Sequence, residues 1–337
     1  MSAARRAVID VGTNSVKLLV ADVLGREIQP VCEESKQTRL GQGFYETHRL
    51  LPEAIANTAH AVATFAERAR ALKTLHIRVI ATSAARDAVN ADELCSAIER
   101  VSGLRLEIIS GEREADWAFQ GVSTDDALAN TPLLLLDVGG GSTEFILGEG
   151  AEKHFCHSFR LGTVRLMETI PHSDPPAAVE LADTRRWLRE FIEDKIRPTL
   201  GPALERESIL HPERTSIPLV GTGGTTTILA RMEATLETYD RAVIESARLS
   251  LARVKWHTEN VWSLPLAKRQ EIVGLPKKRA DVILPGAAII EAVMEAFSFE
   301  ELRVSTRGLR FAAVMNEPAE RLRDFQRDQS WEFDELG

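Results

Sequence analysis

Two glycine-rich stretches of this sequence combine the residue types that bind phosphate groups and metal ions. In "LLLDVGGGSTEFILG", residues 134–148, an apolar run ends on Asp137, three glycines and two hydroxyl residues follow, and Glu144 opens the next apolar run. A tight hairpin turn needs only one or two glycines. Three consecutive glycines therefore predict a loop whose backbone N–H groups approach an anion, with carboxylates placed for a metal ion or a water molecule.

The same layout occurs a second time near the N-terminus, in "VIDVGTNSVKLLV", residues 8–20. Asp10 corresponds to Asp137, and Ser15 corresponds to Ser142. Two unrelated β-hairpin turns are the alternative interpretation of such a pair. The repeat favours two copies of one structural unit that face each other across a cleft and hold a phosphate chain between them.

The hydrophobic pattern predicts the elements that must position these loops. In the first half we expect strands at 6–11, 15–23, 27–36, 76–82 and 104–110, and helices at 52–72, 83–103 and 111–122, the last capped by Ser110. In the second half we expect strands at 132–138, 143–150, 152–162 and 301–306, helices at 163–170 and 176–200, and a strand, loop and helix start within 216–232. The segment between 232 and 301 reads as mostly helical, and a last helical segment begins at Gly308.

Length and element order indicate a duplicated α/β fold with a central cleft. A chain of 337 residues suits two domains rather than one core. "DDALANTP", residues 125–132, is the natural boundary. We therefore expect a first domain over residues 1–125 and a second over 126–307, with the C-terminal helix 308–337 as a candidate to pack back on the first.

Composition excludes several classes of function. The chain is 44% hydrophobic and 27% charged, as in ordinary globular proteins, and its net charge of −9 argues against broad nucleic-acid binding. No apolar run reaches membrane-spanning length and no signal peptide is evident, so a cytoplasmic protein without a membrane partner is expected. Three scattered cysteines favour neither a disulfide framework nor a zinc site.

Five stretches together resemble one known family. They are "AVIDVGTNSVKLLVADV", "ATSAARDAVN", "IISGEREADWAFQGV", "LLLLDVGGGSTEFILG" and "LVGTGGTTTILA". They are similar to the exopolyphosphatase and guanosine pentaphosphate phosphohydrolase family, within the actin-like ATPase superfamily. The resemblance implies two duplicated ribonuclease H-like domains with an interdomain cleft. It also implies hydrolysis of the terminal phosphoanhydride of inorganic polyphosphate, or of the 5′-γ-phosphate of pppGpp, with a divalent metal.

The resemblance also implies roles for individual residues. Glu114 falls on the family's catalytic glutamate, although Arg113 replaces the acidic residue that usually precedes it. The implied metal ligands are Asp10, Asp137 and Glu144, for Mg²⁺ or Mn²⁺, with a K⁺ requirement left open. The implied phosphate-binding residues are Gly12, Thr13, Asn14, Ser15, Lys17, Arg86, Gly139, Gly140, Gly141, Ser142, Thr143, Arg160, Gly221, Thr222, Gly223, Gly224, Thr225 and Arg279.

Other interpretations stay open at this point. Taken singly, Glu114 could be a solvated acid at a helix start, and Arg86 or Arg279 a surface salt-bridge residue. A kinase or ATPase of the same superfamily shares the paired phosphate loops, and a non-catalytic sensor of polyphosphate or (p)ppGpp is a third class. The chain looks like the short form of the family, without the C-terminal His-Asp domain of longer members. Polyphosphate and guanosine penta- or tetraphosphate are the expected small-molecule ligands, and a homodimer is left open.

Overall fold

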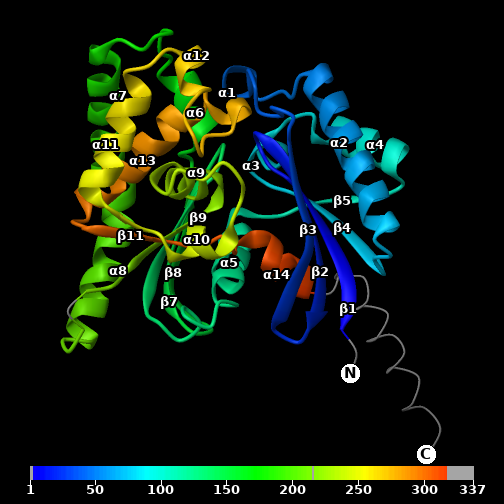
Figure 1. Ribbon diagram of the computed structural model, residues 1–337, viewed down its shortest axis with the longest axis horizontal. Coiled ribbons are helices and arrows are strands. Elements are labelled where there is room, and N and C mark those ends of the chain that lie inside the picture. Colours follow the sequence, from blue (N-terminus) through cyan, green and yellow to red (C-terminus); the bar gives the residue numbers. More distant parts are fainter. Residues whose placement is uncertain (1–2, 215, 317–337) are drawn as a thin grey trace, which may run out of the picture.

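Two α/β domains lie side by side in the computed structural model, which describes residues 3–214 and 216–316 (Figure 1). The first contains β1 (Ala4–Val11), β2 (Ser15–Leu24), β3 (Glu27–Gln37), α1 (Phe44–Thr47), α2 (Pro52–Ala71), β4 (His76–Ala81), α3 (Ser83–Asp87), α4 (Ala91–Ser102), β5 (Leu106–Ile108) and α5 (Gly111–Val122). The second begins with β6 (Leu133–Val138), β7 (Thr143–Glu149), β8 (Glu152–Phe159), α6 (Thr163–Thr169), α7 (Ala178–Phe191), a π-helical stretch (Ile192–Ile196) and α8 (Arg197–Leu210). It continues with β9 (Leu219–Thr222), α9 (Gly223–Glu233), α10 (Arg241–Ser246), β10 (Arg248–Ser250), α11 (Leu251–Trp262), α12 (Leu266–Arg269), a 3-10 turn (Lys277–Arg279), α13 (Ile283–Ala296) and β11 (Glu301–Val304), and α14 (Leu309–Met315) follows.

The two sheets share one strand order, which confirms the predicted duplication. The first is ordered β3-β2-β1-β4-β5, and the second, read the same way, β8-β7-β6-β9-β11-β10. In each, three antiparallel strands form a meander, and the first of them pairs in parallel with the strand that follows the crossover. The fold is therefore α/β with two mixed sheets, as the sequence predicted.

Strand register aims the acidic residues of both hairpins at one place. Asp10 pairs with Lys17 across the first hairpin, and Asp137 pairs with Glu144 across the second. Directly opposed residues of antiparallel strands project from the same face of a sheet. The turns also match, because Gly12 N donates to Ser15 O at 3.0 Å and Gly139 N donates to Ser142 O at 2.9 Å. The chief difference between the copies is a lysine where the other has a glutamate.

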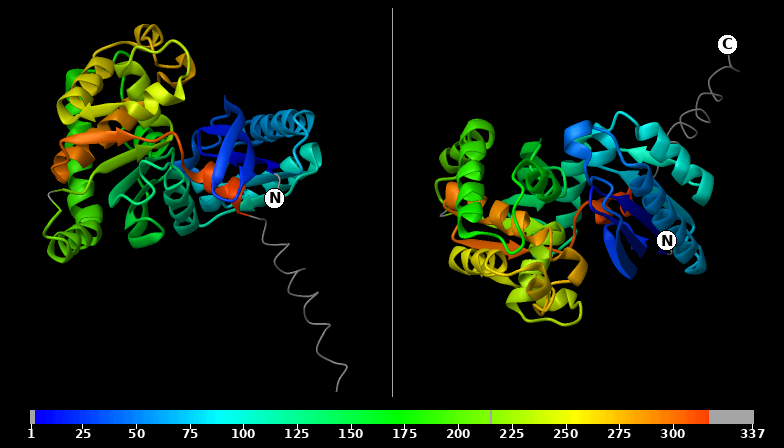
Figure 2. Two further views of the ribbon diagram at one scale, coloured as in Figure 1. Left: turned by 60° about the horizontal axis from the view of Figure 1, so that its bottom comes forward. Right: turned by 90° about the horizontal axis from the view of Figure 1, so that it is seen from above.

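Helices α5 and α14 join the two domains. Phe119 of α5 belongs to a buried cluster with strands of the second sheet, whereas Phe311 of α14 packs with Val8 and Leu19 of the first. Figure 2 shows the orange-red α14 against the blue strands of the first domain. The described part of the C-terminal segment, up to residue 316, thus packs on the first domain, and the rest of the expected helix 308–337 lies outside the described residues.

Several element boundaries differ from those expected. The single helix predicted over 83–103 is divided into α3 and α4, because Asn90 leaves the helical path and its amide exchanges hydrogen bonds with the backbone of Leu50 (2.8 and 3.1 Å). The helix expected to end at residue 200 continues through α8 to Leu210, and the short strand β10 was not predicted. No helix within residues 3–214 and 216–316 is long and apolar enough to cross a membrane.

Candidate active site

A cavity of about 460 Å³ between the domains gathers most of the predicted site residues. Its size falls within the range of small-molecule binding sites, roughly 300–1,000 Å³. The predicted residues that line it are Asp10, Gly12, Thr13, Asn14, Ser15, Lys17, Glu114, Asp137, Gly139, Gly140, Gly141, Ser142, Glu144, Thr222, Gly223, Gly224 and Arg279. Residues more than 260 positions apart in the sequence therefore contribute to one cleft.

The two glycine-rich loops that are expected to bind phosphate, residues 12–15 and 139–142, are called the first and second phosphate loops. They approach each other so closely that the second loop requires glycine. A Cβ on Gly140 would lie 2.8 Å from Thr13 Cβ, and one on Gly141 would lie 2.3 Å from Tyr45 Oη and 2.4 Å from Ser83 Oγ. Real Cβ atoms do not approach other heavy atoms that closely. The glycine run therefore serves the contact between the domains as well as the turn.

Backbone hydrogen bonds hold both loops through their carbonyl groups. Thr13 O accepts from Gly41 N at 2.8 Å, and Asn14 O accepts from Arg39 N at 3.0 Å. In the second loop, Gly139 O accepts from Thr163 N at 3.0 Å and Gly140 O accepts from Val164 N at 2.8 Å. Fixed loops of this kind are preorganised to bind anions through their N–H groups.

A third glycine loop, residues 221–224, brings the N-terminus of α9 to the cleft, and Arg279 lies beside it. Strand β9 leads into α9 at Gly223, whose φ of +85° lies in the region that favours glycine. Partial positive charge at a helix N-terminus favours phosphate. The Arg279 guanidinium lies against Gly224 and donates from Nη1 to Ser15 Oγ of the opposite domain at 3.2 Å. Its buried Nε has no hydrogen-bond partner, so this arginine keeps a donor for a ligand.

Glu114 stands in the first turn of α5, held by an arginine from a different element. Ser110 Oγ caps the helix by accepting from Arg113 N at 3.2 Å. Arg86 of α3 donates from Nη1 to Glu114 Oε2 at 3.0 Å and to Ile109 O at 3.2 Å. Arg86 therefore orients Glu114 from behind, although it does not itself line the cleft.

Burial raises the pKa values of four carboxyl groups in the cleft, those of Asp10, Glu114, Asp137 and Glu144. It raises the pKa of Glu114 to about 7, although the nearby Arg86 charge opposes the rise, and it raises the pKa of Asp137 to about 6. Burial raises the pKa of Glu144 well above its usual range, with further contributions from the negative charges of Glu114 and Asp137. Burial also raises the pKa of Asp10, although Lys17 counteracts the rise. Such clusters are typical of catalytic and ion-binding sites.

The donor set of the cleft suits a hard cation that keeps part of its water shell. The buried Oδ1 of Asp10 has no hydrogen-bond partner. Within residues 3–214 and 216–316, no three His, Cys, Asp or Glu side chains converge closely enough to enclose a metal ion. A divalent ion held by these carboxylates would therefore complete its coordination shell with water and phosphate oxygens.

Five predicted residues do not line the cleft. Arg86 is one of them, as described above. Arg160 is exposed on the surface, and the Thr143 hydroxyl donates to Leu161 O at 2.6 Å. Gly221 packs against Thr226 and Leu302 within the sheet, and Thr225 is buried against Gly286. The last two belong to the packing that supports the third loop.

Sequence analysis missed several residues of the cleft. The missed residues that line it include Ser83, Arg231, Tyr239 and Arg310. Arg310 lies in the basic stretch "VSTRGLRF", residues 304–311, and no role was predicted for this position. Only the packing of α14 on the first domain brings Arg310 to the cleft.

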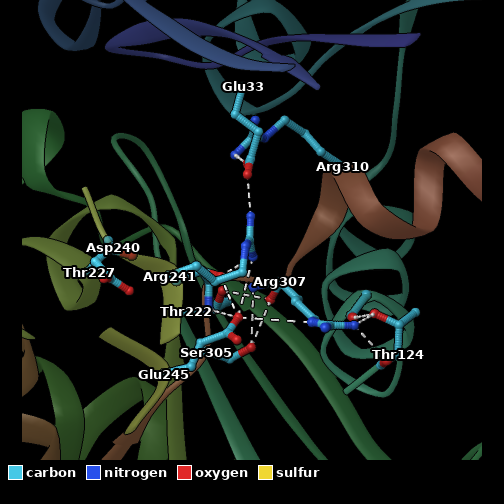
Figure 3. Close-up of polar contacts among 12 residues, drawn as sticks. Glu33, Thr124, Thr222, Thr227, Asp240, Arg241, Glu245, Ser305, Arg307 and Arg310 are labelled. Atoms are coloured by element: carbon cyan, nitrogen blue, oxygen red, sulfur yellow. Dashed lines mark hydrogen bonds and ion pairs between the residues drawn. The ribbon is translucent and has the colours of Figure 1, made fainter. Parts of the chain in front are cut away.

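Polar contacts join the two domains beside the cleft. Figure 3 shows Arg241 of α10 pointing to Glu33 of β3, with which it forms an ion pair. Arg310 Nη2 lies 3.4 Å from the same carboxylate. Arg307 Nη1 donates to Thr124 O at 2.7 Å, which links the segment before α14 to the segment after α5. Glu33 and Arg310 also line the cleft, so these contacts form part of its wall.

Known proteins resemble this chain over most of its length. The model of the Ppx/GppA phosphatase family matches residues 19–317. Exopolyphosphatase 2 of Mycobacterium tuberculosis is 38% identical over 322 residues, an alignment that covers 90% of this chain and 96% of that protein. A guanosine-5'-triphosphate,3'-diphosphate pyrophosphatase of Vibrio vulnificus is 29% identical, over 90% of this chain and 57% of that longer protein.

Solved structures agree with this similarity. The Ppx/GppA enzyme of Aquifex aeolicus has a TM-score of 0.72 at 28% identity, covering 93% of this chain and 99% of that one. An exopolyphosphatase of Cytophaga hutchinsonii has a TM-score of 0.78 at 26% identity, covering 91% and 96% of the two chains. The similarity therefore spans both domains and the cleft between them.

Proposed function

Because this chain belongs to the Ppx/GppA phosphatase family, we propose that it is an exopolyphosphatase whose interdomain cleft releases orthophosphate from the end of inorganic polyphosphate. The observation that carries the proposal is the meeting of two facing phosphate-type loops with the buried carboxylates Glu114, Asp137 and Glu144 in one cavity. Guanosine pentaphosphate ends in the same kind of phosphoanhydride, so it is the second candidate substrate.

Binding of the phosphate chain follows from the charges of the cleft. The N–H groups of the facing loops and the N-terminus of α9 bind non-bridging oxygens. Lys17, Arg279 and Arg310 bring basic side chains to the cleft, which balance the acidic groups and the phosphates. Burial lowers the pKa of Lys17, and the negative charge of Asp10 opposes this change. Positioning and charge neutralisation are the principal requirements of phosphoryl transfer.

Glu114 activates the attacking water in this proposal. Its raised pKa of about 7 lies near the operating pH, where a general base is most effective. Arg86 holds one of its oxygens, Oε2, and leaves Oε1 to accept the water's proton. The proton moves to Glu114 as the water oxygen bonds to the terminal phosphorus, and the bond to the bridging oxygen breaks.

Asp10, Asp137 and Glu144 are the residues that would hold Mg²⁺ or Mn²⁺, directly or through water. A bound divalent ion would neutralise charge that develops on the phosphate oxygens. Ser158 donates to Glu144 Oε1 at 2.7 Å and so orients this carboxylate from the side of β8. The unpartnered Oδ1 of Asp10 supports the same assignment.

Asp137→Asn is expected to raise the Mg²⁺ concentration needed for half-maximal activity by on the order of tenfold or more. The substitution removes one negative charge and keeps the shape of the side chain. Phosphate release should be titrated with Mg²⁺ for wild type and variant at saturating substrate. An unchanged Mg²⁺ dependence would remove Asp137 from the metal site.

The test of function is phosphate release by the purified protein with Mg²⁺ on medium-chain polyphosphate, guanosine pentaphosphate and ATP in parallel. Release from polyphosphate that is lost in the Glu114→Gln protein is the expected result. Release from guanosine pentaphosphate alone would assign the nucleotide as substrate. Turnover of ATP alone, stimulated by an acceptor sugar or a partner, would contradict the proposal and favour a kinase or ATPase.

A further inference from the structure

The lining of the cleft includes a buried hydroxyl group that neither the resemblance nor the proposed mechanism uses. Several buried polar atoms in its lining have no hydrogen-bond partner, among them Asp10 Oδ1, Asn14 Nδ2, Arg279 Nε and Ser83 Oγ. The first three belong to residues already assigned to metal or phosphate. Ser83 is 3% exposed and has no assigned role. A buried hydroxyl without a partner is costly to keep, so its retention indicates a ligand that satisfies it.

The position of Ser83 identifies the part of the substrate it would meet. It is the first residue of α3, three positions before Arg86, so the two side chains share one side of the helix. Arg86 holds Glu114, which places Ser83 at the catalytic end of the cleft. Its Oγ also adjoins Gly141 of the facing loop. A ligand atom within reach of this hydroxyl would therefore also lie near the second phosphate loop.

Tyr45 offers a second hydroxyl beside Gly141, but it belongs to the support of the loop. Tyr45 does not line the cleft, and its ring stacks on the Arg165 guanidinium, 4.1 Å from the ring centroid. Arg165 in turn donates to Gly141 O at 2.8 Å and to Asp87 at 3.1 Å. Ser83 is thus the group of this pair that faces the cavity.

We propose that Ser83 binds the substrate, donating its hydroxyl hydrogen to a non-bridging oxygen of the terminal phosphoryl group. The inference rests on the proposed phosphohydrolase function and adds a contact from the first domain to the group that is transferred. The second phosphate loop, residues 139–142, and Ser83 then hold this group from opposite domains. Ser83 forms no covalent bond to phosphorus, and the proton of the attacking water still goes to Glu114.

The test compares Ser83→Ala with a control that loses a similar hydroxyl elsewhere. Thr58 of α2 is fully buried, its Oγ1 also lacks a partner, and it does not line the cleft. Thr58→Val removes that hydroxyl and nearly keeps the side-chain shape. Steady-state kinetics on polyphosphate and inhibition by added orthophosphate should be measured for wild type and both variants, together with thermal unfolding.

We expect Ser83→Ala to lower kcat/KM about 10- to 100-fold, the range for losing a hydrogen bond to a charged group. Inhibition by orthophosphate should weaken in the same variant. Thr58→Val should match wild type in both measurements. The unfolding temperatures of both variants should not fall, because neither hydroxyl forms a hydrogen bond in the folded protein.

Three results would overturn the inference. A kcat/KM within twofold of wild type would show that the hydroxyl does not contact the substrate. Equal losses in both variants would reveal a structural effect, and a lower kcat with unchanged orthophosphate inhibition would place the hydroxyl away from the phosphoryl group. Wild-type protein that releases no phosphate from polyphosphate or guanosine pentaphosphate would instead contradict the proposed function itself.

Discussion

The Glu114→Gln protein is expected to lose about 10²- to 10⁴-fold in kcat, the usual contribution of a general base. Glutamine keeps the shape of the side chain, and its carbonyl oxygen can still accept from Arg86, but it cannot take a proton from water. Substrate affinity should change little, because the phosphate-binding loops are untouched. Single-turnover phosphate release and equilibrium binding of polyphosphate separate the two quantities.

Glu112→Gln provides the matched control for this experiment. Glu112 lies in the same first turn of α5 but is exposed, and it does not line the cleft. Its substitution removes the same charge from the same helix start and should leave kcat within about twofold. Equal activity of the Glu114→Gln and wild-type proteins would exclude Glu114 as the base. Asp137 and Glu144 would then be the candidate bases.

The pH profile should follow the charge state of Glu114. The base acts when deprotonated, so activity should rise as pH increases through its pKa, which is about 7 in the metal-free protein. A divalent cation in the cleft stabilises the negative charge, so the rise should shift to lower pH as Mg²⁺ is added. The Glu114→Gln protein should lack this part of the profile.

The free energy of unfolding should depend on pH in the direction opposite to activity. Burial raises the folded-state pKa of Glu114 above the ordinary value of 4.5, so the folded protein binds more protons than the unfolded chain between these limits. Without metal, the free energy of unfolding should therefore fall as pH rises from about 4.5 to about 7. The Glu114→Gln protein should be at least as stable as wild type at pH 8, because it has no charge to bury there.

Gly141→Ala is expected to lower activity by about 100-fold while the individual domains remain folded. A Cβ at this position would lie 2.3 Å from Tyr45 Oη and 2.4 Å from Ser83 Oγ, and 3.0 Å from Ser83 Cβ. The serine hydroxyl can rotate, but its Cβ and the tyrosine ring cannot move without a shift of the first domain. Displacement of catalytic groups by about 1 Å can cost on the order of 100-fold in rate. Polyphosphate hydrolysis and the far-UV circular dichroism spectrum are the measurements.

Gly201→Ala is the control for this substitution. Gly201 lies within α8, and its nearest contact from an added Cβ would be Arg197 Cγ at 3.6 Å, an ordinary separation. Alanine there should keep full activity and stabilise the helix by about 0.5–1 kcal/mol. Full activity in Gly141→Ala would mean that the domains do not close on this loop during catalysis.

The repeated pattern of residues was sufficient to predict the fold. Asp10 and Asp137 each end an apolar run and precede a small-residue turn, and a second apolar run follows each turn. Such signals are local, so they can be recognised in the sequence even when the neighbouring strands are unknown. The helix predicted over 83–103 failed at Asn90 because the competing hydrogen bonds come from Leu50, 40 positions away.

The sequence by itself determined the residue types of the site: paired glycine loops, acidic residues at strand ends, and Glu114 at a helix start. Only the tertiary structure decided how they act together, because contacts such as Arg279 with Ser15 or Arg310 with Glu33 join segments more than 260 positions apart. Burial in the cleft also raises the pKa of Glu114 to about 7, and Ser83 Oγ has no hydrogen-bond partner there. Desolvation depends on everything that surrounds a group, which no local pattern of residues specifies.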